Sequence, residues 1–247
     1  MGAILTRAGS GVPGDITRQT YCVVDDRAYD AAKMPAAFGA PVKLVAGKIT
    51  KIEASDLASV FYGFLVRMVP SIAGDTAQTL GGGTPNPLSL ANTLLRGFIN
   101  VLCLVGTPVA NGLVYMRVVV DGTKLVGDLE ATSDVAATAG AMVGTGNATA
   151  GTLSATQDAQ AGVYRALFTA ATAFNLIDPK GDIKKVGATG AAYTADGVTL
   201  TITVGATPAV AGDYIDVTVV KKNVPLVGVV WNVDGKDADN VTEVRVG

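Results

Sequence analysis

Short runs of β-branched and other apolar residues recur along the chain, separated by turns rich in Gly, Pro and Asp-Gly. In the clearest run, residues 198–204, aliphatic residues alternate with Thr, so the two kinds of side chain face opposite ways. A period of two is typical of antiparallel sheet with one buried face. The pattern therefore predicts an all-β protein. Further strands are predicted at residues 21–25, 41–45, 48–52, 60–69, 98–105, 114–120, 163–168, 173–177, 214–220, 226–233 and 241–246.

Two segments depart from this pattern. Residues 88–95 predict a short helix, although Asn92 and Thr93 weaken it. Residues 131–156 are a low-complexity run of Ala, Gly, Thr and Ser in which neither a strand period nor a helix period survives. We expect this run to separate two structural units.

The sequence then predicts three parts. Residues 1–20 have few large apolar groups and predict an extended N-terminal arm, because they cannot bury enough surface to fold alone. Residues 21–146 plus 223–247 predict a β-rich body, an antiparallel β-barrel or a jelly-roll. Residues 147–222 predict an Ig-like β-sandwich, since strands recur about every ten residues with turns between them. We assign the last strands to the body because the chain changes character after Pro225 and carries the single Trp, Trp231.

Composition narrows the possible partners. Charged residues make up 16% of the 247 residues, and the net charge is −2 with a pI near 5.1. Nucleic-acid binding needs a concentrated basic face, so we expect no nucleic-acid partner. The longest apolar stretch, residues 97–120, is broken by Gly106-Thr107-Pro108 and predicts two strands rather than a membrane-spanning helix. We expect no membrane partner and no secretory signal. A weakly charged, small-residue surface favours a protein that a partner covers.

The chain offers little catalytic chemistry. It contains no histidine, which removes the usual general base at neutral pH and the commonest metal ligand. Residues 234–240 resemble a calcium loop, but the twelfth position from Asp234 is Arg245 where a bidentate Glu is needed. We interpret this segment as an acidic hairpin turn. We expect no enzyme activity, no cofactor and no metal. Cys22 and Cys103 lie in apolar runs and are interpreted as buried reduced thiols, with one disulfide as the alternative.

Two groups of motifs carry a family resemblance. The first group is Val12-Pro13-Gly14-Asp15 with Thr17-Arg18, then Phe38-Gly39-Ala40-Pro41-Val42 and Gly63-Phe64-Leu65-Val66-Arg67. This group resembles the structural cement, or head decoration, proteins of tailed bacteriophages. The second group is Ala161-Gly162-Val163-Tyr164-Arg165, Ile177-Asp178-Pro179-Lys180-Gly181, Gly190-Ala191-Ala192-Tyr193 and Ala211-Gly212-Asp213. This second group is similar to a β-domain that decoration proteins often carry.

The resemblance implies a structural protein of the virion that is assembled in the host cytoplasm and sits on the exterior of the phage head. It implies a homotrimer that bridges neighbouring subunits of the major capsid protein. An arm, a neutral β body and an appended sandwich suit this role, because many modest contacts around a shell add up. The capsid contacts are expected in the early motif, at Val12, Pro13, Gly14, Asp15, Thr17 and Arg18.

Two other functions were weighed. A major capsid subunit needs a long spine helix, and the sequence predicts none. A surface-exposed receptor-binding or carbohydrate-binding β module remains the alternative, although such modules usually display several exposed aromatic residues and aromatics are 6% here.

Overall fold

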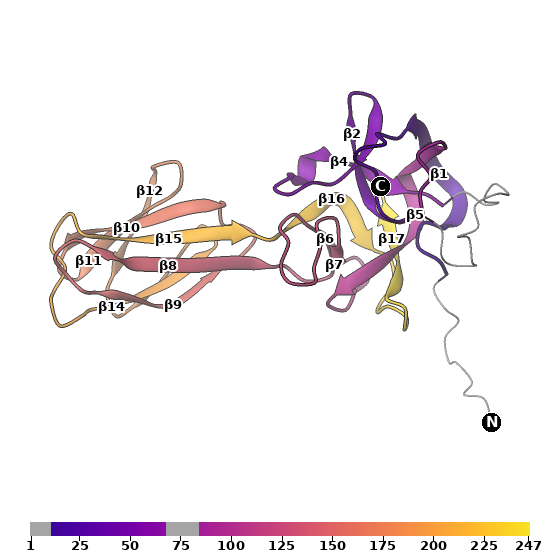
Figure 1. The fold of residues 1–247 in the computed structure, drawn as a ribbon. Helices are drawn as coiled ribbons and strands as arrows, with labels where there is room; N and C mark the ends of the chain where they lie inside the picture. Colours follow the sequence, from indigo (N-terminus) through magenta and orange to yellow (C-terminus); the bar gives the residue numbers. More distant parts are fainter. Residues whose placement is uncertain (1–10, 68–83) are drawn as a thin grey trace. The chain divides into compact units, whose positions relative to one another are not determined.

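The computed structural model describes residues 11–67 and 84–247, and the chain divides into two compact units. The first comprises Met1–Ser133 and Asn223–Gly247, and the second Asp134–Lys222. Figure 1 shows the yellow C-terminal strands β16 and β17 within the first unit. Apart from one 3-10 turn, η1 (Ala58–Val60), the regular elements among the described residues are all strands, so the all-β prediction is confirmed. No helix in the described part of the chain is long and apolar enough to cross a bilayer.

A closed β-barrel forms the centre of the first unit. Its sheet has the order β17-β16-β6-β7-β5-β4-β2-β3, and β17 pairs again with β5, which closes the ring. β1 pairs along β5 outside this path. The predicted barrel is confirmed. The strands of this unit are β1 (Ile16–Ala28), β2 (Pro41–Val45), β3 (Lys48–Lys51), β4 (Phe61–Leu65), β5 (Leu90–Val105), β6 (Leu113–Arg117), β7 (Leu129–Glu130), β16 (Asn223–Trp231) and β17 (Val241–Val246).

Strand β5 organises the barrel because it is long enough to pair with four other strands: β1, β4, β7 and β17. Ile99, Val101 and Cys103 on one face of β5 lie in the core with Trp231. On the opposite face of the strand, Leu102 is partly exposed and Leu104 is exposed. This alternation is the pleat of a strand with one buried face.

The helix predicted at residues 88–95 is wrong. Leu90 begins β5, and its first residues pair with β1 through Ala28 and with β4 through Leu65. Thr93 and Leu94 are fully buried there. Local helix preference is weak in this segment, so strand pairing on both edges decides its structure.

A buried charged cluster fastens the end of β6 to β7 and β16. The Arg117 guanidinium donates to both Glu130 carboxylate oxygens, Nε to Oε1 at 2.6 Å and Nη2 to Oε2 at 3.0 Å. Asn223 Nδ2 donates to Glu130 Oε2 at 2.5 Å and to the Thr132 carbonyl at 2.9 Å. The side chains of Arg117 and Glu130 are 0% exposed, and Asn223 is also fully buried. The charges are therefore desolvated, and they are compensated by one another and by hydrogen bonds such as these.

The second unit is a sandwich of two sheets. A five-stranded sheet has the order β12-β11-β10-β15-β8, and a three-stranded sheet has the order β13-β14-β9. Side chains of both sheets, among them Tyr164, Phe174 and Leu200, share one core. The Ig-like character of this sandwich stays a prediction. The strands are β8 (Val135–Val143), β9 (Thr149–Ala155), β10 (Gly162–Ala170), β11 (Ala173–Ile177), β12 (Ile183–Ala188), β13 (Ala192–Ala195), β14 (Val198–Thr203) and β15 (Tyr214–Lys221).

The low-complexity run contains two strands where the sequence predicted none. Residues 134–146, which the sequence analysis placed in the body, include β8, and β8 pairs with β15 inside the second unit. β9 follows within the same run and pairs with β14. Ala, Gly and Thr give these strands little hydrophobic contrast between their two faces, so the period of two is hard to see. Backbone pairing with neighbours of strong pattern, such as β14, forms them instead.

Glu53 makes the stability of the first unit depend on pH. Lys33 Nζ and Lys43 Nζ each lie 2.8 Å from its carboxylate, and their hydrogen bonds lower the pKa of Glu53 from 4.5 to about 2. Because the folded state favours the charged form of Glu53, the stabilisation from its ion pairs is complete above pH 4.5. This stabilisation is lost as the pH falls toward 2. We expect the Glu53→Gln variant to lose less stability than the wild type between pH 7 and pH 3. Urea unfolding at both pH values measures this difference, and an equal loss in both proteins would contradict it.

Candidate functional site

The N-terminal motif lies on the barrel wall and is bonded to it. The Gly14 amide donates to the Asn100 carbonyl at 2.8 Å, and the Asn100 amide donates to the Asp15 carbonyl at 3.0 Å. The Arg67 amide donates to the Gly14 carbonyl at 2.9 Å. The Asp15 amide donates to the Val12 carbonyl at 3.1 Å, which closes a turn. Residues 12–15 therefore belong to the folded barrel, whereas residues 1–10 of the predicted arm lie outside the described residues.

Gly14 is required at the tightest point of this turn. Its φ is +90°, and an added Cβ would lie 2.6 Å from Phe38 Cβ and 3.0 Å from the Arg67 amide nitrogen. Gly47 has a similar φ of +77° but open space around it. The two glycines thus share the backbone requirement and differ in crowding.

We expect Gly14→Ala to lower the free energy of unfolding by about 3 kcal/mol, because it adds a steric clash to the strain of a positive φ. Gly47→Ala carries only the strain, about 1 kcal/mol. Urea unfolding followed by Trp231 fluorescence measures both variants. Equal losses would show that the contact with Phe38 does not restrict the segment.

Glu243 on β17 holds the second half of the motif. Its carboxylate accepts hydrogen bonds from Thr17 Oγ1 and Asn232 Nδ2, and Arg18 Nη2 lies 3.3 Å from Oε2. The Arg18 guanidinium also stacks over the Phe98 ring, 4.3 Å from its centroid. The Arg18 side chain is nevertheless 55% exposed, against 11% for that of Glu243. The motif thus presents a cation whose position is fixed by a buried partner.

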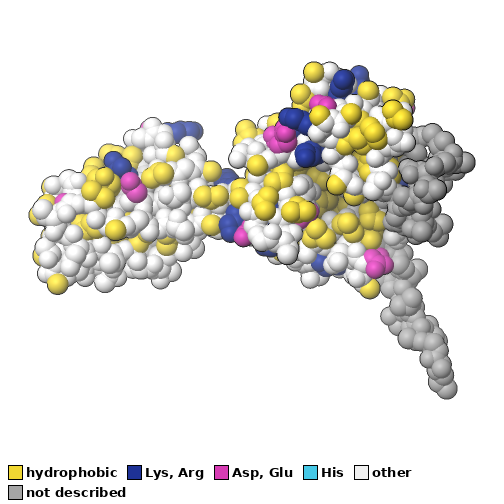
Figure 2. Space-filling model, in the orientation of Figure 1, with side chains coloured by type: hydrophobic (Ala, Val, Ile, Leu, Met, Phe, Trp, Pro, Cys, Tyr) yellow, Lys and Arg dark blue, Asp and Glu magenta, His cyan; other side chains and the backbone are white. Residues whose placement is uncertain are grey.

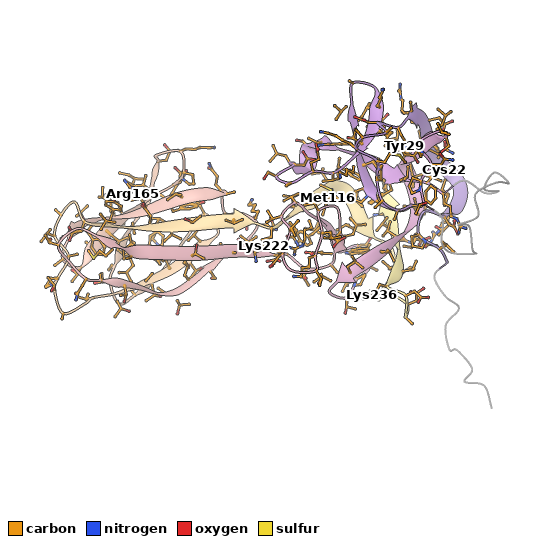
Figure 3. All side chains as sticks on the ribbon, viewed as in Figure 1. Cys22, Tyr29, Met116, Arg165, Lys222 and Lys236 are labelled. Carbon is orange, nitrogen blue, oxygen red and sulfur yellow. The ribbon has the colours of Figure 1, made fainter. Side chains whose placement is uncertain are left out.

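Beyond the motif, β1 presents an apolar surface. Tyr21 is 85% exposed, Val23 49% and Val24 38%. We call these three residues the β1 surface. Among the described residues β5 is the strand that forms a ladder with β1. Cys22, labelled in Figure 3, packs instead toward the core beside Gly97.

Tyr21 holds an unfavourable backbone conformation. Its φ is 67°, in the left-handed region that favours glycine, and it lies within an irregular stretch of the β1–β5 register. A bulky residue in this region costs about 1–2 kcal/mol. The backbone at this position favours glycine, yet the residue is an exposed tyrosine. Backbone strain together with an exposed aromatic ring is typical of a residue that contacts a partner.

An ion pair borders the β1 surface. Arg27 Nε lies 2.7 Å from Asp25 Oδ2, and Tyr62 Oη donates to the same oxygen at 2.5 Å. The Tyr62 hydrogen bond, and then that of Arg27, lower the pKa of Asp25. The carboxylate stays ionised and paired at neutral pH, so this border of the surface is nearly neutral. Leu88 and Leu90, 94% and 57% exposed, continue the apolar character at the far end of the strand.

A small apolar cleft lies near the motif. It has a volume of about 200 Å³ and is lined by Phe38, Ile52, Leu102, Leu104 and Leu125 among others. Within the described residues no group of acidic or cysteine side chains could hold a metal ion. In the predicted acidic turn, Asp237 accepts instead from the amides of Asp239 and Val241 at 3.0 and 2.8 Å. The β1 surface and the apolar cleft are suited by their shape to binding another macromolecule.

The structure brings the predicted site residues together, but they differ in how far they are exposed to solvent. Gly14 is buried, and Val12, Pro13 and Asp15 are half-buried, so Thr17 and Arg18 offer the largest exposed area of the motif. The sequence analysis missed the β1 surface. A signal existed, because Val23 and Val24 are adjacent and a strand cannot turn both into one core.

Both cysteines are free thiols. Cys103 is buried, and burial raises the pKa of its thiol. It is therefore a poor nucleophile and a core residue, whereas Cys22 is half-buried.

Comparison with known proteins gives one family. A family model described as "Structural cement protein (E217 gp24/Pam3 gp6)" matches residues 4–162, from before the N-terminal motif to the start of β10. No curated protein matches the chain. Two crystal structures of FlgL from Xanthomonas campestris, in space groups H3 and C2, are 27% and 26% identical to this chain, each with a TM-score of 0.28.

The FlgL likenesses are partial. They cover 37% and 36% of this chain and 31% and 29% of the FlgL chains, so each match spans less than a third of the FlgL length. A TM-score this low carries no argument about fold or function.

Proposed function

The chain belongs to the structural cement protein family, and from this membership we propose that it binds the exterior of a phage head and bridges neighbouring major capsid subunits. The family implies a structural role in the virion and association with the phage capsid. The exterior position, the bridging of subunits and a homotrimeric state are the proposed parts. Assembly in the host cytoplasm is proposed with them.

The observation that carries the proposal is the β1 surface next to the N-terminal motif. Both lie within the matched residues 4–162. Tyr21 combines 85% exposure with a strained backbone. An exposed aromatic anchor within an apolar surface gives affinity for a partner. Arg18, fixed by Glu243, adds a directed charge at the start of the same strand.

The mechanism needs no chemical step. Each copy contributes a modest contact to more than one capsid subunit, and opening the shell must break many such contacts together. Because the β1 surface itself is uncharged and Arg18 adds a single charge, we infer that binding weakens only modestly as the salt concentration rises. The carbohydrate-binding alternative has less support. Of the aromatic residues in the second unit, Tyr164, Phe168, Phe174 and Tyr193 are buried and Tyr214 is half-buried beneath Arg165, which leaves no platform of exposed rings.

The proposal is tested on heads assembled from the major capsid protein of the phage that encodes this chain. The purified protein is added to expanded heads, and the particles are pelleted, imaged by cryo-electron microscopy and heated. We expect density on the outer surface between capsid subunits and a higher temperature of shell opening. A protein that stays in the supernatant, or heads that open at the same temperature with and without it, would refute the proposal.

A further inference from the structure

The two outer faces of the second unit differ in character. On the three-stranded sheet, the outward residues of β14 are Thr199, Thr201 and Thr203, and the neighbouring strands add Thr194 and Ser154. Thr194 and Thr199 are hydrogen-bonded across the strands at 3.2 Å. Short hydroxyl side chains are well suited to a sheet face that water covers. The outer face of the three-stranded sheet is therefore typical of a surface in contact with water.

The outer face of the five-stranded sheet carries large exposed aliphatic side chains among its polar ones instead. Strand pairing places Val186 beside Asn175 and Ile183 beside Ile177, all on the side away from the core. Large exposed side chains occur on four of its five strands. They are Ile183 (62% exposed) and Val186 (63%) on β12, Val163 (48%) on β10, Val220 (40%) on β15 and Val143 (49%) on β8. We call this the aliphatic face. Figure 2 shows how few charged side chains the visible surface of this unit carries.

The centre of the aliphatic face carries one cation and one anion that neutralise each other. Arg165 on β10, labelled in Figure 3, lies directly across from Asp216 on β15, with Nε 2.8 Å from Oδ1 and Nη2 3.0 Å from Oδ2. The guanidinium also lies over the Tyr214 ring, 3.9 Å from its centroid. The face is therefore neutral and holds both partners of an ion pair.

We propose that the aliphatic face binds the same face of a second copy of this chain when copies lie side by side on the head. This inference rests on the proposed function. A two-fold contact uses one surface twice, so the Arg165 guanidinium of one copy can meet the Asp216 carboxylate of the other. A neutral face with a central pair brings no like charges together in that arrangement.

The size of the face determines when the contact forms. Five strands about 4.8 Å apart and seven residues long give roughly 24 by 20 Å, or about 500 Å² per copy. A stable complex buries about 800 Å² per partner, so this face cannot hold two free copies together. On a head, neighbouring copies are already concentrated and the same contact becomes intramolecular in effect. The family model ends at residue 162, so most of this sandwich lies beyond the matched residues.

Cross-linking tests the proposal directly. Val163→Cys, on the central strand β10, is made together with Cys22→Ser, which leaves only the buried Cys103, and a bismaleimide reagent is added to free protein and to decorated heads. We expect a covalent dimer of the chain on heads and none in free solution at equal total concentration. Cross-linking to the major capsid protein, or a chain that binds heads but stays monomeric, would overturn this inference alone. Failure of the wild type to bind heads would refute the proposed function first.

Binding isotherms give a second measurement. We expect Val163→Lys, beside the central pair, to abolish cooperative filling of heads and to raise the half-saturating concentration roughly tenfold, since each copy then binds without its neighbour. Thr203→Lys, on the hydroxyl-lined face of the other sheet, is the matched control and should fill heads like the wild type. Equal isotherms for Val163→Lys and the wild type would contradict the contact.

Discussion

Replacing Arg117 by alanine lowers the free energy of unfolding of the first unit by about 3–5 kcal/mol, because Glu130 is left as a buried carboxylate without its cation. Both side chains are 0% exposed, so water cannot take over the role of the guanidinium. Trp231 lies in the core of the same unit and is the single Trp of the chain, so its fluorescence in urea reports this unit alone.

Arg165→Ala is the matched control. Arg165 also forms a two-point pair with a carboxylate, but its side chain is 45% exposed and that of Asp216 is 35% exposed. We expect a change of less than about 1 kcal/mol. The double variant R117M/E130L should recover most of the loss, because it removes both charges and keeps the volume. A loss in the double variant as large as in Arg117→Ala would assign the effect to packing rather than to the unpaired charge.

Replacing Tyr21 by glycine is expected to separate stability from binding. Glycine relieves the backbone strain at φ 67°, so the free energy of unfolding stays equal or rises by up to about 1 kcal/mol. Loss of an aromatic anchor at an interface costs about 2 kcal/mol, so the affinity for heads falls roughly thirtyfold. Head binding and urea unfolding are measured on the same preparation.

Ala46→Gly is the control for the backbone effect. Ala46 is an exposed residue of the first unit with φ 49°, so strain at a positive φ is relieved without loss of an aromatic ring. It should bind heads like the wild type. If Tyr21→Gly also binds normally, the β1 surface is not the capsid contact.

The sequence predicted those elements in which hydrophobic contrast is strong. The Thr alternation at residues 198–203 became β14, with Val198, Leu200 and Ile202 fully buried. The run at residues 173–177 became β11 with the same bounds. In these strands, burial of one face both forms the structure and leaves the pattern in the sequence.

Other elements were hidden because their structure depends on partners distant in the chain. β8 has no apolar period, and its residues become a strand through pairing with β15. The first residues of β5 have little intrinsic preference for a strand, but they pair with β1 on one edge and with β4 on the other. The β1 surface left only a partial signal. Adjacent valines indicate that one of them faces outward, but the exposure of both Val23 and Val24 follows from register shifts against β5, which the local sequence does not show.

The position of the second unit in the chain has one more consequence. Its two ends meet, since the Lys222 amide donates to the Asp134 carbonyl at 2.9 Å. A domain whose two ends are adjacent can be inserted into another fold without distorting it. The barrel can therefore carry a different inserted domain in place of the second unit, and proteins that share the barrel can differ widely in this domain. The same junction is a natural place to fuse a foreign antigen or enzyme to a virus particle.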